Sequence, residues 1–387
     1  MRFNQHKNKL IKFLFYSLMV VLLLPMLHHF IPLFKIKPLE GAYEVTNEKP
    51  KLNLKNWKNE TFQKNAEKYV QDHIYYKPFL IRSNNEIQFR LFNKPKVVWV
   101  VAGKENYFYE ENYLKAYYGQ DYLGQKTIEE KVFKLKKIQD TLEKLGTHLF
   151  VVLAPGKGSF YPEFIPDSWP KDKHSTNFKG FKTVFKKQQV NYLDFKSWFE
   201  NNKNTSPHPL FPKTGIHWSK YGEVLAADSI IEYLSQHFKK QLPYVQIDTV
   251  LTSSNMQDTD DDIEQSLNLF FNIPDLEMGY PQWKWIDSST FYHPKILTVA
   301  DSYYWGMFNF GMSTNAFGNG QFWFYNESIY PDSYSKPINV DDINLKKSVE
   351  QNKAVLLLFT DANLNRFGFG FIDDLYHEYY FSKVSND

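Results

Sequence analysis

The chain has 387 residues, of which 43% are hydrophobic, so it can bury a sizeable core in one large domain or two moderate ones. Its 46 basic and 43 acidic residues leave a net charge of only +3, and no basic patch is interleaved with aromatic residues, which argues against a nucleic-acid partner. The absence of cysteine excludes thiol catalysis and disulfide bracing.

The first stretch of the chain has the pattern of a membrane anchor. From Phe13 to Phe34 it is almost wholly apolar, and these 22 residues would form a helix of roughly 33 Å, enough to cross a bilayer core. The basic residues before it are Arg2, Lys7, Lys9 and Lys12. The positive-inside rule then predicts a cytoplasmic N-terminus and an exported remainder. A cleaved signal peptide is the alternative, but no small-residue cleavage site follows.

Three regions are expected along the chain. Residues 1–37 would be the cytoplasmic tail and transmembrane anchor, residues 38–95 a stalk and a helical segment, and residues 96–387 an α/β domain. The helical segment is expected because residues 57–92 repeat apolar side chains at helical spacing, which indicates two packed helices.

Strands and helices alternate through the α/β domain. Fully apolar strands separated by helices are typical of a parallel sheet that is buried on both faces. Expected strands lie at 97–101, about 107–109, 147–154, 190–193, 244–247, 295–300, 322–325 and 354–359. Expected helices lie at 127–145, 177–189, 196–201, from just after His217 to about 238, after Ser302, and at 340–350. An insertion of irregular structure is expected over about 251–290.

Lys157 follows the strand at 147–154, within Pro155-Gly-Lys-Gly158. Open α/β sheets bind their ligands at this end of the strands. The spacing is not that of a phosphate-binding loop. Lys157 therefore either orients an anionic or polyhydroxylated ligand or caps backbone carbonyls, and both interpretations stay open.

His217 stands in a loop just before a long amphipathic helix, after the proline-rich segment 206–212. Prolines hold that segment rigid and extended, which suits a residue whose position matters. A loop histidine of this kind can act as a base, although it can also simply hydrogen-bond the loop.

A run of acidic residues lies in the polar stretch 253–265. Its members are Asp258, Asp260, Asp261 and Asp262. A calcium-binding EF-hand loop would need glycine and glutamate where Ile263 and Leu269 stand. We therefore expect a solvated loop and predict neither a metal nor a cofactor.

Ser302 ends the most informative stretch of the chain. The apolar strand 295–300 runs into Asp301-Ser302, and aromatic residues that can open a helix follow. A serine at such a strand-to-helix turn exposes its hydroxyl beyond the sheet edge, near N–H groups that can receive an oxyanion. Alone, it is more often only a helix cap. Together with His217 it becomes a candidate nucleophile.

These segments, in this order, resemble the SGNH-hydrolase-like alginate O-acetyltransferases of the AlgX/AlgJ type. The resemblance runs from about residue 96 to 360 and rests on Gly103-Lys-Glu-Asn-Tyr-Phe-Tyr109, Ala154-Pro-Gly-Lys157, His217-Trp218 and Ala300-Asp-Ser302. It implies a three-layer αβα fold and an exported, often membrane-anchored protein. Such proteins move acetyl groups onto polysaccharide hydroxyls, usually beside a membrane-bound O-acyltransferase that supplies the acetyl.

The resemblance also assigns roles to residues. Ser302 would attack the acetyl donor and His217 would take its proton, with Asp301, Trp218 and Lys157 in support. The family's Asp-x-His-Trp element places a carboxylate two residues before the histidine, where this chain has Gly215.

The glycine leaves three alternatives open. Asp361 or Asp194 could supply the orienting acid, with Asp361 the first choice because it follows a strand of the same sheet. A backbone carbonyl could orient His217 instead, or the site is not catalytic. The resulting prediction is a membrane-anchored, periplasmic polysaccharide O-acetyltransferase. Its rivals are a carbohydrate acetylesterase and a non-catalytic carbohydrate-binding or assembly protein.

Overall fold

The computed structural model describes residues 2–30, 36–41, 48–73 and 76–382. It divides the chain into two compact units. The helical unit comprises Met1–Val98 and Glu264–Asn272, and the sheet unit comprises Trp99–Ile263 and Ile273–Asp387.

The helical unit contains α1 (Arg2–Phe30), α2 (Leu54–Lys58), α3 (Thr61–His73) and α4 (Lys77–Phe92). The two helices expected over 57–92 are present as α3 and α4. Within the described ranges, no helix combines the length and the apolar character needed to cross a membrane. The expected span at 13–34 is therefore not supported, and its residues 31–34 lie outside the described residues.

A six-stranded sheet forms the centre of the sheet unit, in the order β4-β3-β10-β7-β8-β9. Its strands are β3 (His148–Ala154), β4 (Tyr192–Asp194), β7 (Ile296–Ala300), β8 (Phe322–Phe324), β9 (Ser328–Tyr330) and β10 (Ala354–Thr360). The pairs from β4 to β8 are parallel, as predicted, but β9 runs antiparallel to β8. Tyr325 and Asn326 turn the chain there with φ of 53° and 56°. The sequence hides this hairpin because no glycine marks the turn.

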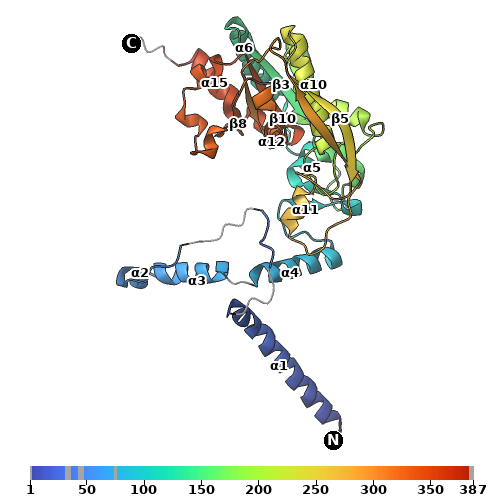
Figure 1. The fold of residues 1–387 in the computed structure, drawn as a ribbon, viewed down its shortest axis with the longest axis vertical. Helices are drawn as coiled ribbons and strands as arrows, with labels where there is room; N and C mark the ends of the chain where they lie inside the picture. The colour runs from blue at the N-terminus through green and yellow to red at the C-terminus, as the bar shows by residue number, and fades with distance from the viewer. Residues whose placement is uncertain (1, 31–35, 42–47, 74–75, 383–387) are drawn as a thin grey trace. The chain divides into compact units, whose positions relative to one another are not determined.

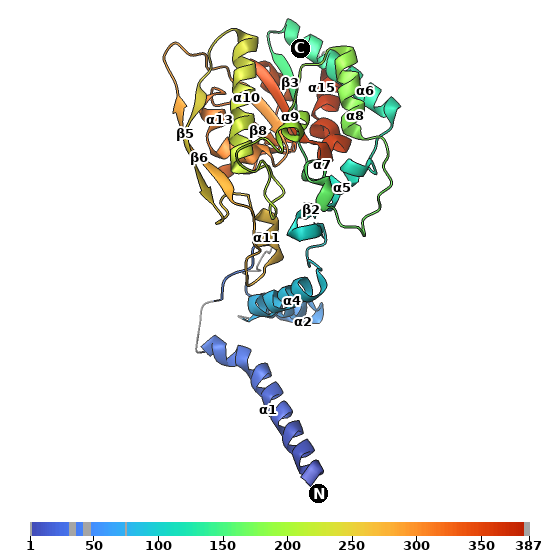
Figure 2. The same cartoon turned by 90° about the vertical axis from the view of Figure 1, so that its right-hand side faces the viewer.

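Helices cover both faces of the sheet (Figures 1 and 2). On one face, Leu149, Val151 and Leu153 of β3 share a core with α6 (Gln125–Lys144), α8 (Asn177–Gln188), α14 (Leu345–Glu350) and α15 (Phe371–Tyr380). On the other, Phe150 packs edge-on against Tyr233 of α10 (Lys220–Phe238). The alternation of side chains along a strand therefore builds a three-layer αβα unit.

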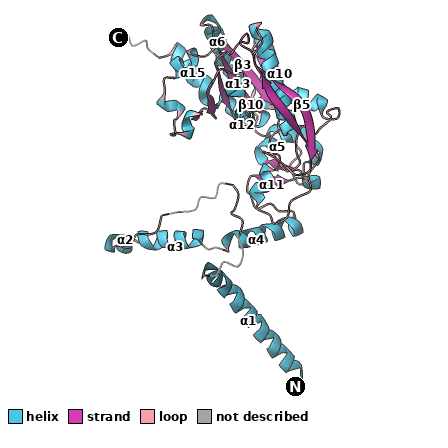
Figure 3. Ribbon diagram, in the orientation of Figure 1, coloured by secondary structure: helices cyan, strands magenta, loops and turns pink. Residues whose placement is uncertain are grey.

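The expected irregular insertion over 251–290 is wrong in part, because it contains the end of β5 (Tyr244–Ser253) and the whole of β6 (Met278–Ile286). These two strands pair antiparallel and are drawn in magenta in Figure 3. Pro281 lies within β6, and a proline inside an apolar run argues against a strand when only the sequence is read.

The carboxyl ends of three central strands meet at one edge. Thr360 of β10 is in register with Ala154 of β3, and Leu358 with Ala300 of β7. The remaining short elements include β1 (Val100–Ala102), β2 (Phe108–Glu110), α5 (Glu111–Tyr118), α7 (Lys157–Phe160), α9 (Phe195–Asn202), α11 (Asp262–Leu267), α12 (Tyr304–Asn309) and α13 (Met312–Asn315). Lys157, Asp301 and Ser302 all follow directly from strands that end here.

Candidate active site

Ser302 lies in the turn between β7 and α12. The turn is held by Asp301, which is fully buried. One oxygen of its carboxylate accepts hydrogen bonds from the Thr360 backbone N–H and the Asn363 side-chain amide, both at 2.8 Å, and the other accepts from the Tyr303 N–H at 3.1 Å. Asp301 thereby ties the Ser302 turn to the end of β10.

The loop that carries His217 is held from two further directions. The carboxylate of Asp275 accepts from the backbone N–H groups of Lys213 at 3.0 Å and Thr214 at 2.9 Å. The Tyr303 hydroxyl donates to the Ile216 carbonyl at 2.7 Å. These bonds fix the backbone on both sides of Gly215 and so fix the position of the imidazole.

The imidazole of His217 joins a serine to a carboxylate. Its Nε2 lies 2.9 Å from Ser302 Oγ, and its Nδ1 lies 2.6 Å from Asp262 Oδ2. The other oxygen of Asp262 accepts from the Ile216 N–H at 2.8 Å. A carboxylate on Nδ1 requires a proton there, which leaves Nε2 free to accept the serine proton. The three side chains have the geometry of a nucleophile, a base and an orienting acid.

Neighbouring carboxyl groups set the charge of His217. Burial lowers its pKa, but the carboxylates of Asp262, Glu110 and Asp301 raise it by more, so that its pKa lies above 6.5. Glu110, at the end of β2, is a member of the site that the sequence did not reveal. Burial raises the pKa of Glu110 to about 7, against the opposing effect of His217. Tyr325 also lies near Ser302: burial raises the pKa of its hydroxyl, and Ser302 opposes this effect.

Asp262 is the residue that the sequence analysis missed. We expected the acidic run before it to form a solvated loop, yet Asp262 is the first residue of α11 and points to the histidine. Nothing in the run separates Asp262 from Asp258, Asp260 or Asp261. The signal in the sequence that could have led to Asp262 is Gly215. Glycine has no carboxylate, so any orienting acid must come from another segment.

The absence of a side chain at Gly215 explains why Asp262 can reach His217. A Cβ at this position would lie 2.5 Å from the Thr259 carbonyl oxygen and 2.7 Å from that of Asp260. Both distances are too short for real Cβ atoms, so only glycine lets the backbone of 259–260 pass directly over the loop. An aspartate at 215 and Asp262 in its present place exclude each other.

The expectation that Asp361 or Asp194 orients His217 is corrected by this geometry. Asp361 accepts a hydrogen bond from the Ser159 hydroxyl, and burial raises its pKa to about 6. The Asp361 side chain thus contacts the segment that follows β3, whereas Ser302 follows β7 on the other side of β10. Asp194 caps α9 by accepting from the Ser197 N–H at 2.9 Å.

Lys157 and Trp218 are buried side chains that contact the loop carrying His217 or its surroundings. Lys157 is fully buried, and its Nζ donates to the carbonyls of Lys213 and Gly215 at 2.5 Å each, which is the carbonyl-capping interpretation. Burial lowers its pKa to about 7. Trp218 is also buried and meets the Tyr303 ring edge-on at 5.1 Å between centroids.

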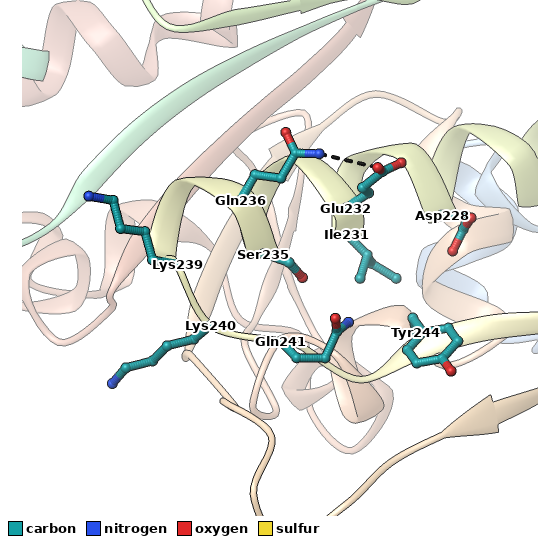
Figure 4. Close-up of a pocket in the computed structure, with 9 residues that line it drawn as sticks. All are labelled: Asp228, Ile231, Glu232, Ser235, Gln236, Lys239, Lys240, Gln241 and Tyr244. Carbon is teal, nitrogen blue, oxygen red and sulfur yellow. Dashed lines mark hydrogen bonds between the residues drawn. The ribbon is translucent and has the colours of Figure 1, made fainter.

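Two cavities lie along α10, one near each end. A hollow of about 560 Å³ at the C-terminal end is lined by the residues shown in Figure 4, where Gln236 donates to Glu232 at 3.2 Å. His217 precedes the opposite end of this helix, which is about 28 Å away for 19 residues at 1.5 Å each. A smaller hollow of about 230 Å³ includes Lys220, near His217.

Substituting Gly215 tests the close approach. In Gly215→Ala the new methyl group must push the 259–260 backbone away, so we expect Asp262 to leave His217. The measurement is the low-field proton resonance of the His217 Nδ1–H, which should be lost in Gly215→Ala and in Asp262→Asn. Asp361→Asn is the control and should keep it. A Gly215→Ala protein with an unchanged resonance would contradict the argument.

Part of the chain is similar to known proteins. Residues 100–269 match the family described as the SGNH hydrolase-like domain of the acetyltransferase AlgX, a range that includes His217 and Asp262 and ends before Ser302. Two curated relatives are named probable alginate O-acetylase AlgJ. The one from Pseudomonas syringae pv. tomato is 25% identical over 46% of this chain and 44% of its own length. The one from Pseudomonas putida is 24% identical over 39% and 37%.

Solved structures give a looser likeness. The O-acetyltransferase domain of Pseudomonas putida AlgJ is 15% identical with a TM-score of 0.45, over 71% of this chain and 99% of that one. Pseudomonas aeruginosa AlgX is 16% identical with a TM-score of 0.41, over 71% and 67%. The chain spans less than half the length of the curated relatives. The family match over residues 100–269 supports the resemblance found in the sequence: this part of the chain is similar to the SGNH hydrolase-like domain of the acetyltransferase AlgX.

Proposed function

We propose that the sheet unit O-acetylates a polysaccharide through an acetyl-enzyme on Ser302. The observation that carries the proposal is the unbroken line of hydrogen bonds from Ser302 through His217 to Asp262. The names of the curated relatives support acetylation as the chemistry. The main argument for a non-catalytic protein was the missing acid at 215, and Asp262 offers a replacement.

In the first half of the proposed reaction, Ser302 Oγ attacks the acetyl carbonyl of the donor while His217 Nε2 takes the hydroxyl proton. The tetrahedral oxyanion needs hydrogen-bond donors. The Tyr303 N–H already donates to Asp301, so we assign this role to the Ser302 N–H and the Tyr325 hydroxyl. The donor group then leaves with the proton from His217, and the acetyl group stays on Ser302.

In the second half, a sugar hydroxyl takes the place of the donor. His217 removes its proton, the oxygen attacks the acetyl carbonyl, and the bond to Ser302 Oγ breaks. The proton returns to Ser302, so the enzyme is restored and the acetyl ester lies on the sugar. Asp262 keeps the Nδ1 proton in place through both halves and stabilises the imidazolium that forms in each.

The first test uses the full chain with a chromogenic acetyl ester. Ser302→Ala and His217→Ala should each lower kcat/KM by about 10³-fold or more, because the nucleophile and base act as a unit. Asp361→Asn is the matched control and should stay near wild-type activity, provided that circular dichroism shows an unchanged fold. A Ser302→Ala variant with full activity would falsify the mechanism.

Adding an acceptor oligosaccharide to the same assay addresses the rivals. An acetyltransferase forms acetylated oligosaccharide, detected by mass spectrometry, and the yield depends on Ser302. An acetylesterase, which uses water as its acceptor, releases acetate alone. No acetyl release and no product from folded wild-type protein would favour the binding or assembly role.

The pH dependence tests the position of Asp262. His217 must be neutral to act as a base, so activity should fall as pH drops through its pKa, which the carboxylates of Asp262, Glu110 and Asp301 hold above 6.5. Asp262→Asn removes one of these charges. We expect the acid limb of kcat/KM to move to lower pH, together with a rate loss of roughly 10³- to 10⁴-fold. An acid limb that stays in place would speak against this contact.

Placement outside the cytoplasm is also part of the proposal. Basic residues precede an apolar segment in the sequence, and side chains of α1 such as Phe13, Leu18 and Leu22 are exposed. We propose that the N-terminal segment attaches the protein to a membrane, with the sheet unit on the periplasmic side. A membrane-bound O-acyltransferase would supply the acetyl groups there.

Fractionation tests this placement. Removing residues 1–37 should move the protein from the membrane fraction to the supernatant, whereas Ser302→Ala, the control, should stay with the membranes through alkaline carbonate extraction. A full chain that remains in the supernatant would contradict membrane attachment.

A further inference from the structure

The hollow of about 230 Å³ near the start of α10 has no part in the proposed chemistry of the triad. Its polar and aromatic lining comes from Lys220, Gln257, Asp258, Tyr280, Gln282 and Trp283, all in the sheet unit. Sites for drug-sized ligands commonly measure about 300–1,000 Å³, so this hollow suits a smaller group, such as one sugar ring.

The hollow adjoins the triad because the same segments build both. Lys220 comes three residues after His217, and Asp258 four residues before Asp262. A fully extended chain covers about 3.5 Å per residue, so these pairs lie within about 11 Å and 14 Å of each other. Phe310, in the turn after α12, lies 5.4 Å from the Lys220 Nζ. The hollow is therefore within reach of a short oligosaccharide that also meets Ser302.

The lining has the two features that bind sugars. Trp283 is half-buried and lines the hollow, so an aromatic wall borders it, and the Lys220 ammonium lies 5.3 Å from the centre of this ring. Gln282, exposed on β6, and Gln257 add amide groups, and Asp258 adds a carboxylate that is 56% exposed. An aromatic face packs against the C–H face of a sugar ring, while amides and carboxylates hydrogen-bond its hydroxyls.

The charges of the hollow select against an acidic sugar. Lys220, the cation in the lining, is 2.9 Å from Glu223 Oε1 and 3.7 Å from Asp258 Oδ2. Its charge is already shared between two carboxylates. The carboxylate of a uronate would therefore meet Asp258 without a free cation from Lys220, and like charges at short range repel each other.

We propose that this hollow is an acceptor subsite that holds an uncharged sugar residue of the polysaccharide while a nearby unit presents its hydroxyl to Ser302. The proposal rests on the proposed function and names the substrate class of the same site: a neutral glycan, in contrast to the uronate polymer in the names of the relatives. The term acceptor subsite is used below for the six residues named above.

Calorimetric titration of the full-length Ser302→Ala protein tests the subsite without turnover. The probes are cellotetraose, a neutral tetrasaccharide, and tetramannuronate, an acidic one of equal length. Cellotetraose should bind more tightly. Trp283→Ala should weaken its binding roughly three- to tenfold, as expected for the loss of an aromatic wall. Trp198→Ala removes an exposed tryptophan of α9 outside the subsite and should change nothing.

Asp258→Asn provides the charge test. It should strengthen tetramannuronate binding and leave cellotetraose within about twofold, because it removes a repelling carboxylate and keeps a hydrogen-bonding side chain. The proposal is overturned if neither probe binds, if tetramannuronate binds more tightly than cellotetraose, or if Trp283→Ala has no effect. Hydrolysis of a small acetyl ester by the wild-type protein, which keeps Ser302, is measured in parallel. If the wild type does not hydrolyse the ester, the proposed function is overturned. If it does, but Trp283→Ala leaves sugar binding unaltered, the subsite alone is overturned.

Discussion

The site depends on the contact between two backbone segments at Gly215. Without a side chain there, the carbonyls of Thr259 and Asp260 come closer to the loop than any Cβ would allow. This approach carries Asp262 to the histidine and lets its second oxygen accept from the Ile216 N–H at 2.8 Å. Position 215 therefore has no carboxylate, and the glycine there is what allows the carboxylate of Asp262 to reach His217.

A close approach of this kind is useful only if the loop cannot move away. Asp275 binds the loop through its N–H groups, and Lys157 binds it through its carbonyls. Both side chains replace hydrogen bonds that the loop would otherwise make to water, and hydrogen bonds to an ionised group are stronger than neutral ones. Removing one partner would leave the other groups desolvated and unpaired, which costs more than the bond itself contributes.

The sequence predicts the features that follow from local pattern and strand order. The apolar strands at 148–154 and 354–360, the sheet edge where they end, and the contact of Ser302 with His217 belong to this class. Asp262 does not, because its partner is 45 residues away and its own surroundings read as a solvated loop. The prediction that Asp361 orients His217 failed for a related reason. Strand order places Asp361 at the correct edge of the sheet, but it does not give the direction in which its side chain points after the strand. Pro281 argues against a strand at β6, but a proline is tolerated in an edge strand, and among the described residues β6 pairs with β5 alone.

The place of the acid also decides which chains a sequence search can recognise. A signature that demands aspartate two positions before the histidine would classify this chain as one that has lost its activity. The geometry indicates a different signature, in which a residue without a side chain stands at that position and a carboxylate opens a short helix far downstream. Related chains that lack the aspartate before the histidine can therefore be searched for the second signature before they are classified as inactive.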